Sequence, residues 1–164
     1  MRTRLGPFSD HPRLDEIAHR MFREFSRMEY GLKAVGHLKR KGRDGPAEAD
    51  WDSFAHAIDR AFGQRLSANP DLQSAVEYIR THPPKKQIVR DGVLGWSGIP
   101  PTSDSETGIL LKYVGRVRNN LFHGGKFNGH WIDPERSEQL LLRCLVVLNA
   151  CLLASPDVRE AYEH

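Results

Sequence analysis

The chain has 164 residues, which is enough for one domain with its own hydrophobic core. Hydrophobic residues make up 39% of it, as in a soluble protein, and a net charge of +3 permits an acidic partner without demanding one. The longest apolar stretch, over residues 145–154, is interrupted by Asn149 and is too short to cross a membrane. Residues 1–8 lack the apolar segment of a signal peptide. We therefore expect one cytoplasmic domain over residues 1–164 that enters no membrane.

The first half of the chain predicts helices joined by irregular segments. Residues 1–12, which include two prolines, form an irregular lead-in. Apolar residues recur at helical spacing over 14–38 and again over 49–66, which predicts two helices with a basic, glycine-containing loop between them. A third helix begins with Asn69 as N-cap and Pro70 as first helical residue, and it ends before a pair of prolines.

Residues 83–104 are the least regular part of the sequence, and a connection of this length often carries function. Its cations and its aromatic side chain are Lys85, Lys86, Arg90 and Trp96. We interpret it as a solvated basic loop with Trp96 packed into the core. The alternative is that the cations contact phosphate groups while Trp96 stacks on a base. No strand pattern stands out, and the segment permits at most a short hairpin around Asp91-Gly92.

A further helix is predicted after Ser103 and Glu106, which have the spacing of a capping box. Its apolar stripe consists of Leu110, Val114, Val117 and Leu121. Its opposite side carries Lys112, Arg116, Asn119, Asn120 and His123. Arg118 falls instead inside the apolar arc, where a charge is costly unless it is paired or faces a polar cleft. It is therefore either a structural arginine, snorkelling or paired with a buried carboxylate, or a functional one.

Arg118 and His123 do not share one face of this helix. On a regular helix they point about 140° apart. Either the glycines at 124 and 125 end the helix and redirect His123, or a second copy of the chain supplies one of the two groups.

Asp133 and Pro134 predict the start of the last helix, which is apolar almost all round over 140–153, as in a central or interface helix. Cys144 and Cys151 are seven residues apart on it, about 10 Å, which is too far for a disulfide. We expect both to be reduced core thiols. No CxxC pair and no HExxH motif is present, so we expect neither a metal site nor a cofactor.

The hallmark of the HEPN superfamily is an arginine followed, after four to six residues, by a histidine, commonly with a small polar residue directly after the arginine. Arg118, Asn119 and His123 match this pattern, with four residues between the arginine and the histidine. The chain resembles that superfamily from about Leu14 to Ala154. The resemblance implies an all-α, up-and-down bundle of about four to five helices that forms a homodimer, in which two motifs meet in one cleft. Some toxin members carry a tyrosine two residues after the histidine, where a partner enzyme modifies them. Gly125 occupies that position here, so the resemblance does not imply that partner.

The resemblance also implies a function. Many members are metal-independent endoribonucleases of toxin–antitoxin and other defence systems, some restrained by an antitoxin protein. His123 would act as general base or acid, and Arg118 would hold the scissile phosphate. Asn119 would orient His123 or bind phosphate. Further contacts to RNA are expected from Asn120, Lys126 and Arg116. The expected products end in 2′,3′-cyclic phosphate.

Two other interpretations stay open. The first is a non-catalytic HEPN-like module that binds RNA, a nucleotide or a protein. The second is a purely structural helical bundle, in which replacing Arg118 damages folding rather than activity. His123 by itself is also open to a structural role, as a helix C-cap residue whose ring bonds a free carbonyl.

Overall fold

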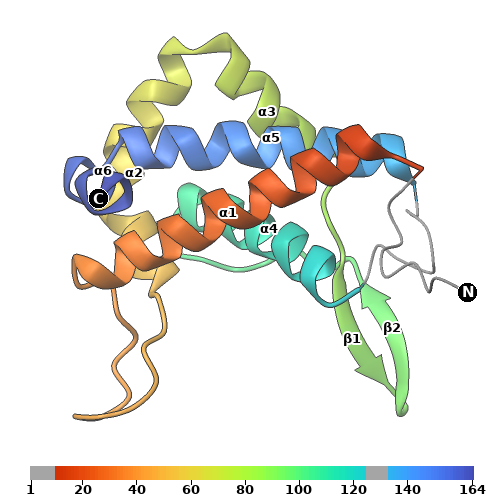
Figure 1. Ribbon diagram of the computed structural model, residues 1–164, viewed down its shortest axis with the longest axis horizontal. Helices are drawn as coiled ribbons and strands as arrows, with labels where there is room; N and C mark the ends of the chain where they lie inside the picture. The colour runs from red at the N-terminus through yellow and green to blue at the C-terminus, as the bar shows by residue number, and fades with distance from the viewer. Residues whose placement is uncertain (1–9, 125–132) are drawn as a thin grey trace, which may run out of the picture.

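The computed structural model describes residues 10–124 and 133–164. Within these ranges it is mostly helical, as the sequence predicts, with six helices and one two-stranded sheet (Figure 1). The elements are α1 (Pro12–Ala34), α2 (Trp51–Ala68), α3 (Pro70–Thr81), β1 (Lys86–Arg90), β2 (Val93–Ser97), α4 (Glu106–Phe122), α5 (Pro134–Leu153) and α6 (Pro156–Glu163).

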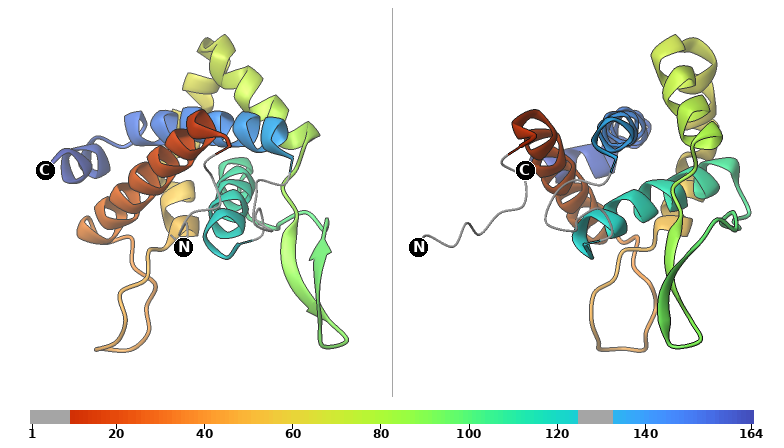
Figure 2. Two further views of the ribbon diagram at one scale, coloured as in Figure 1. Left: turned by 45° about the vertical axis from the view of Figure 1, so that its right-hand side comes forward. Right: turned by 90° about the vertical axis from the view of Figure 1, so that its right-hand side faces the viewer.

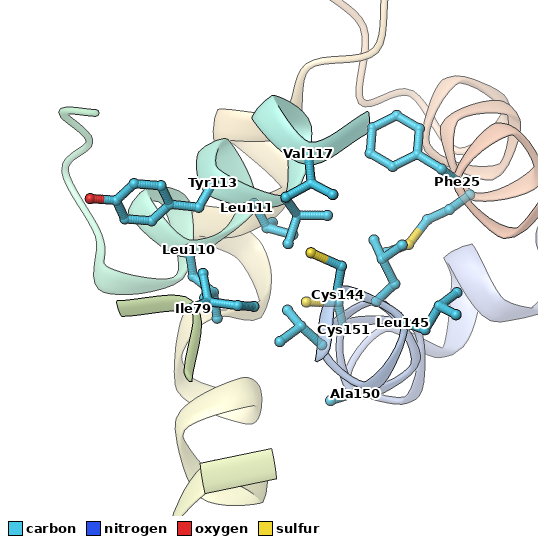
Figure 3. Packing of buried hydrophobic residues seen from close by; sticks show 14 of the residues in the cluster. Phe25, Ile79, Leu110, Leu111, Tyr113, Val117, Cys144, Leu145, Ala150 and Cys151 are labelled. Carbon is cyan, nitrogen blue, oxygen red and sulfur yellow. The ribbon is translucent and has the colours of Figure 1, made fainter. Parts of the chain in front are cut away.

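The long helix α5 forms the centre of the bundle. It packs against α3 on one side and α1 on the other, α2 packs against α4, and α6 packs against α1 (Figure 1). Figure 3 shows Cys144 and Cys151 of α5 facing Leu110 and Val117 of α4 across the core. Both cysteines are free and buried, and burial raises the pKa of both thiols because the thiolate cannot be solvated there. Among the described residues, no single helix is long and apolar enough to cross a membrane.

Two of the predicted helix starts are confirmed by their caps. The Asn69 side chain accepts a hydrogen bond from the Leu72 amide at 3.1 Å, and Asp133 accepts one from the Arg136 amide at 3.2 Å. The predicted cap at Ser103 is wrong. The N-cap of α4 is Ser105, which accepts from the Gly108 amide at 2.9 Å.

The first helix ends at Ala34, four residues earlier than predicted. Gly36 has φ +96°, and the Gly36 and His37 amides donate to the carbonyls of Lys33 and Leu32. This is a Schellman motif, in which a left-handed glycine satisfies the last carbonyls of a helix. The apolar periodicity continues past this point, but the glycine ends the helix.

The segment 83–104 is not an irregular loop throughout. β1 and β2 pair as an antiparallel hairpin, and Asp91 and Gly92 at its turn both have positive φ, 52° and 75°. Such a pair is typical of the two-residue turns that match the twist of a hairpin. The interpretation of Trp96 as a core residue is wrong, since it lies on the hairpin and is 41% exposed.

Helix α6 was not predicted from the sequence. It packs on α1 at Gly31, where a Cβ atom would lie only 3.2 Å from the carbonyl oxygen of Val158. Tyr162 joins the same contact through a hydrogen bond from its hydroxyl to Glu24. Burial and this carboxylate raise the pKa of Tyr162 to about 12.

Candidate functional site

A groove of about 600 Å³ runs along α4, and we call it the α4 groove. Helix α4 and its C-cap contribute Gly108, Leu111, Lys112, Gly115, Arg116, Asn119, Asn120 and His123. The other walls consist of Phe25, Trp51, Asp52, Lys86, Gln87, Pro101 and Thr102. It therefore lies between α4, α1, the start of α2 and the start of the hairpin, and its volume is in the range of ordinary ligand sites.

His123 lies at the C-terminal end of this groove. It is the C-cap of α4, and its amide donates to the carbonyl oxygen of Asn119 at 2.8 Å. Gly124 follows with φ +72°, so the chain leaves the helix at once. The side chain of His123 is exposed and lines the groove beside Asn119, one helical turn earlier. The cap hydrogen bond uses only the backbone amide of His123, so the residue can end the helix and still present its imidazole to the groove.

Arg118 does not line the groove. Its guanidinium lies 4.8 Å from the centre of the Phe122 ring and 5.4 Å from that of Phe25. Its Nη1 donates to Oδ1 of Asn119 at 2.9 Å. The sequence left open a buried carboxylate as partner, but among the described residues no carboxylate pairs with this arginine. Cation–π contacts with the two rings stabilise its charge within the apolar arc of the helix.

Asn119 connects the two ends of the motif. Its oxygen accepts from Arg118, and the residue lines the groove together with His123. One side chain therefore separates the arginine from the cavity that contains the histidine.

Arg116 and Asn120 hold the hairpin against α4. The Arg116 guanidinium donates to the carbonyl oxygens of Ile99 at 2.8 Å and of Pro84 at 3.4 Å. The Asn120 amide nitrogen donates to the carbonyl oxygen of Lys85 at 2.8 Å, and the residue is only 4% exposed. Both line the groove, and both use side-chain donors to bind the main chain. Their contacts to RNA stay a prediction. The sequence did not indicate this structural role, because the acceptors are backbone atoms of another segment.

Lys126, the third predicted RNA contact, and Gly125 lie outside the described residues.

We expect Asn120→Ala to lower the free energy of unfolding by about 0.5–1.5 kcal/mol, because it removes the partly buried hydrogen bond to the carbonyl oxygen of Lys85. The melting temperature should fall by about 2–4 °C for each kcal/mol. Asn149→Ala, an exposed asparagine on α5, is the matched control. Equal melting temperatures for the two variants would show that the contact to Lys85 contributes nothing.

Sequence reasoning missed the place of Trp51 and of Gly115 in this groove. Trp51, the first residue of α2, is partly exposed and lines the groove. Gly115 lines it in the middle of α4, and a glycine inside a helical pattern was the one local signal for it. Lys86, a phosphate contact only in the alternative interpretation of residues 83–104, lines the groove from β1.

The charges along the groove are unequal. Lys86, Lys112 and Arg116 line it together with a single carboxylate, Asp52, which pairs with Lys112 at 3.1 Å. The groove therefore has an excess of positive charge. Among residues 10–124 and 133–164, no three His, Cys, Asp or Glu side chains lie close enough together to hold a metal ion.

Comparisons with protein-family models, with curated proteins and with solved structures found no match to this chain. The assignment of function therefore depends on its residues and their geometry.

Proposed function

We propose that the protein is a metal-independent endoribonuclease of HEPN type. One observation carries the proposal most directly. Asn119 bonds Arg118 through its side chain and lines the same groove as the exposed His123. The motif thus offers a cation suited to phosphate and a group suited to proton transfer at one end of α4.

The reaction needs only the RNA and these side chains. His123 of one motif takes the proton from the ribose 2′-OH, and the oxygen attacks the adjacent phosphorus. The bond from phosphorus to the 5′ oxygen breaks, and an acid, the second histidine of the dimer or a water, returns a proton to that oxygen. Arg118 stabilises the negative charge on the phosphate during attack. The products are a 2′,3′-cyclic phosphate and a 5′-hydroxyl, and DNA resists because it lacks the nucleophile.

The proposal includes a homodimer with a composite site. Within one chain Arg118 lies outside the groove, over the ring of Phe122, which belongs to an exposed aromatic pair. Phe22 is 43% exposed, Phe122 is 46% exposed, and their centres are 5.0 Å apart. A second copy packed on this aromatic pair would bring its own motif near the first. In a toxin–antitoxin setting, an antitoxin protein would be a partner that covers the groove.

If this pair forms the interface, Phe22→Ser should weaken the dimer by at least about tenfold, since buried aromatic residues dominate interface energies. Tyr30→Ser removes another exposed ring of α1 and should leave the association unchanged. Sedimentation velocity over a concentration series measures both. A wild-type chain that stays monomeric at every concentration would contradict the composite site.

The alternative function is a non-catalytic RNA-, nucleotide- or protein-binding module. It is favoured by the position of Arg118, which does not line the groove that His123 lines, so one chain by itself does not bring the two groups of the motif together in one cavity.

The deciding experiment is incubation of end-labelled RNA with the protein in the presence of EDTA. Cleavage products with cyclic phosphate ends, and no cleavage of DNA of the same sequence, are expected. Binding without cleavage on varied RNAs would favour the alternative module.

A further inference from the structure

We infer that the α4 groove binds a single-stranded stretch of RNA next to the cleaved phosphate and leads it from His123 along α4 toward Trp51. The inference rests on the proposed function in one respect, that His123 marks the position of the cleaved bond. It adds the form of the substrate and a binding path that the Arg–His motif does not specify.

The shape of the groove suits an extended ligand. Its lining on α4 begins at Gly108 and ends at His123, fifteen residues apart, which is about 22 Å along a helix. Gly115, halfway along, has no atom within 4 Å of the position of a Cβ. The floor is therefore open at its centre, and a strand can lie close to the helix backbone there.

The charge of the groove suits a phosphate backbone. Lys86 lines one wall and Lys112 and Arg116 line the other, while the single carboxylate, Asp52, is bound by Lys112. The two hydrogen bonds of Arg116 to main-chain carbonyls use part of its donors and leave its positive charge. Such an excess of fixed cations attracts the backbone in a salt-dependent way.

An aromatic ring in the wall of the groove favours a single strand over a duplex. Trp51 stacks on Phe25 with ring centres 4.9 Å apart, and it is partly exposed and lines the groove. Unpaired bases stack on such rings and present their edges to amides such as Asn119 and Gln87. The bases of a duplex are stacked on one another and cannot reach Trp51.

Two basic arms flank the groove. The loop over residues 35–50 and the β1–β2 hairpin project from the same side of the bundle, with α4 between them (Figures 1 and 2). The loop carries Arg40 and Arg43, and the hairpin carries Arg90, all of them exposed. Trp51 follows the base of the first arm and Lys86 begins the second, and both line the groove. A strand in the groove would therefore lie between the bases of the two arms.

The test fills the groove without touching the motif. Gly115→Leu should fold, because a Cβ meets nothing at this position and leucine favours a helix. Gly63→Leu is the matched control, a partly exposed helical glycine of α2 with no neighbour within 4 Å and no place in the groove. Lys86→Glu, an exposed residue on the opposite wall, is a second variant that does not depend on the helix.

All three changes are made in the full-length chain that also carries His123→Ala, so that the RNA is not cut, and thermal melts confirm folding. Fluorescence anisotropy with a labelled single-stranded RNA should give a dissociation constant raised at least about tenfold by Gly115→Leu and by Lys86→Glu. Gly63→Leu should leave it unchanged. A duplex of the same sequence should bind more weakly than the single strand.

The outcomes separate this inference from the proposed function. Unchanged RNA affinity in both groove variants, or tighter binding of the duplex, would overturn the groove as the binding path even if cutting depends on His123. If the groove variants bind RNA more weakly but the wild type does not cleave it, the groove is supported as the binding path and the proposed nuclease function is contradicted.

Discussion

Replacing His123 by alanine is expected to slow RNA cleavage by about 10²–10⁴-fold, because the reaction loses its proton-transfer group. The melting temperature should stay unchanged, since the side chain is exposed and the helix is capped through the backbone. Arg118→Ala should reduce cleavage to a similar degree by removing charge stabilisation from the transition state. It should also cost about 0.5–1 kcal/mol of stability, because the guanidinium leaves the faces of Phe25 and Phe122.

Matched controls make this result specific. His19→Ala and Arg60→Ala remove an exposed histidine of α1 and an exposed arginine of α2, neither of which lines the groove. Both should cut RNA at the wild-type rate. The double variant of Arg118 and His123 should be hardly slower than either single one, since residues that act as a unit are not additive. Full activity of the His123 variant would eliminate the proposed mechanism.

Gly108→Ala is expected to lower the free energy of unfolding by about 1–3 kcal/mol, the usual cost of overpacking. A Cβ at this buried position would lie 2.0 Å from Oγ and 2.9 Å from Cβ of Ser103. The hydroxyl can rotate away, but the Cβ of Ser103 moves only if the backbone before α4 moves. At about 2–4 °C for each kcal/mol, a thermal melt detects the loss.

Gly115→Ala is the comparison, on the same helix and with no neighbour within 4 Å. It should raise stability by about 0.5–1 kcal/mol, because alanine has less conformational freedom to lose than glycine. Equal melting temperatures for Gly108→Ala and Gly115→Ala would contradict this prediction. They would show that the backbone at Ser103 moves aside without a cost in stability.

The local rules of the sequence determined much of the helical framework. Asn69 and Asp133 begin helices where a cap followed by proline predicts them, since a side chain that bonds an amide three residues away needs no distant partner. The same rules misplaced the start of α4, because Ser103 and Ser105 are both plausible caps. In the structure Ser105 bonds the Gly108 amide, while the hydroxyl of Ser103 donates to the Asp52 carboxylate of α2 at 3.5 Å. The Arg–His motif is a local pattern too, and its role as a nuclease site stays a prediction.

Only the tertiary structure decided what the polar residues of α4 contact. Arg116 and Asn120 bind carbonyl oxygens of the two segments that flank the hairpin, 17 to 35 residues away in the chain. The position of Arg118 over two rings depends on α1 lying beside α4, and α6 forms its contact at Gly31 of α1. A periodicity or a cap reports on energies within a few residues. The hydrogen-bond acceptors, the aromatic rings and the close backbone contacts described above come from segments that are distant in the chain and meet only in the folded protein. The sequence around each residue therefore does not indicate them.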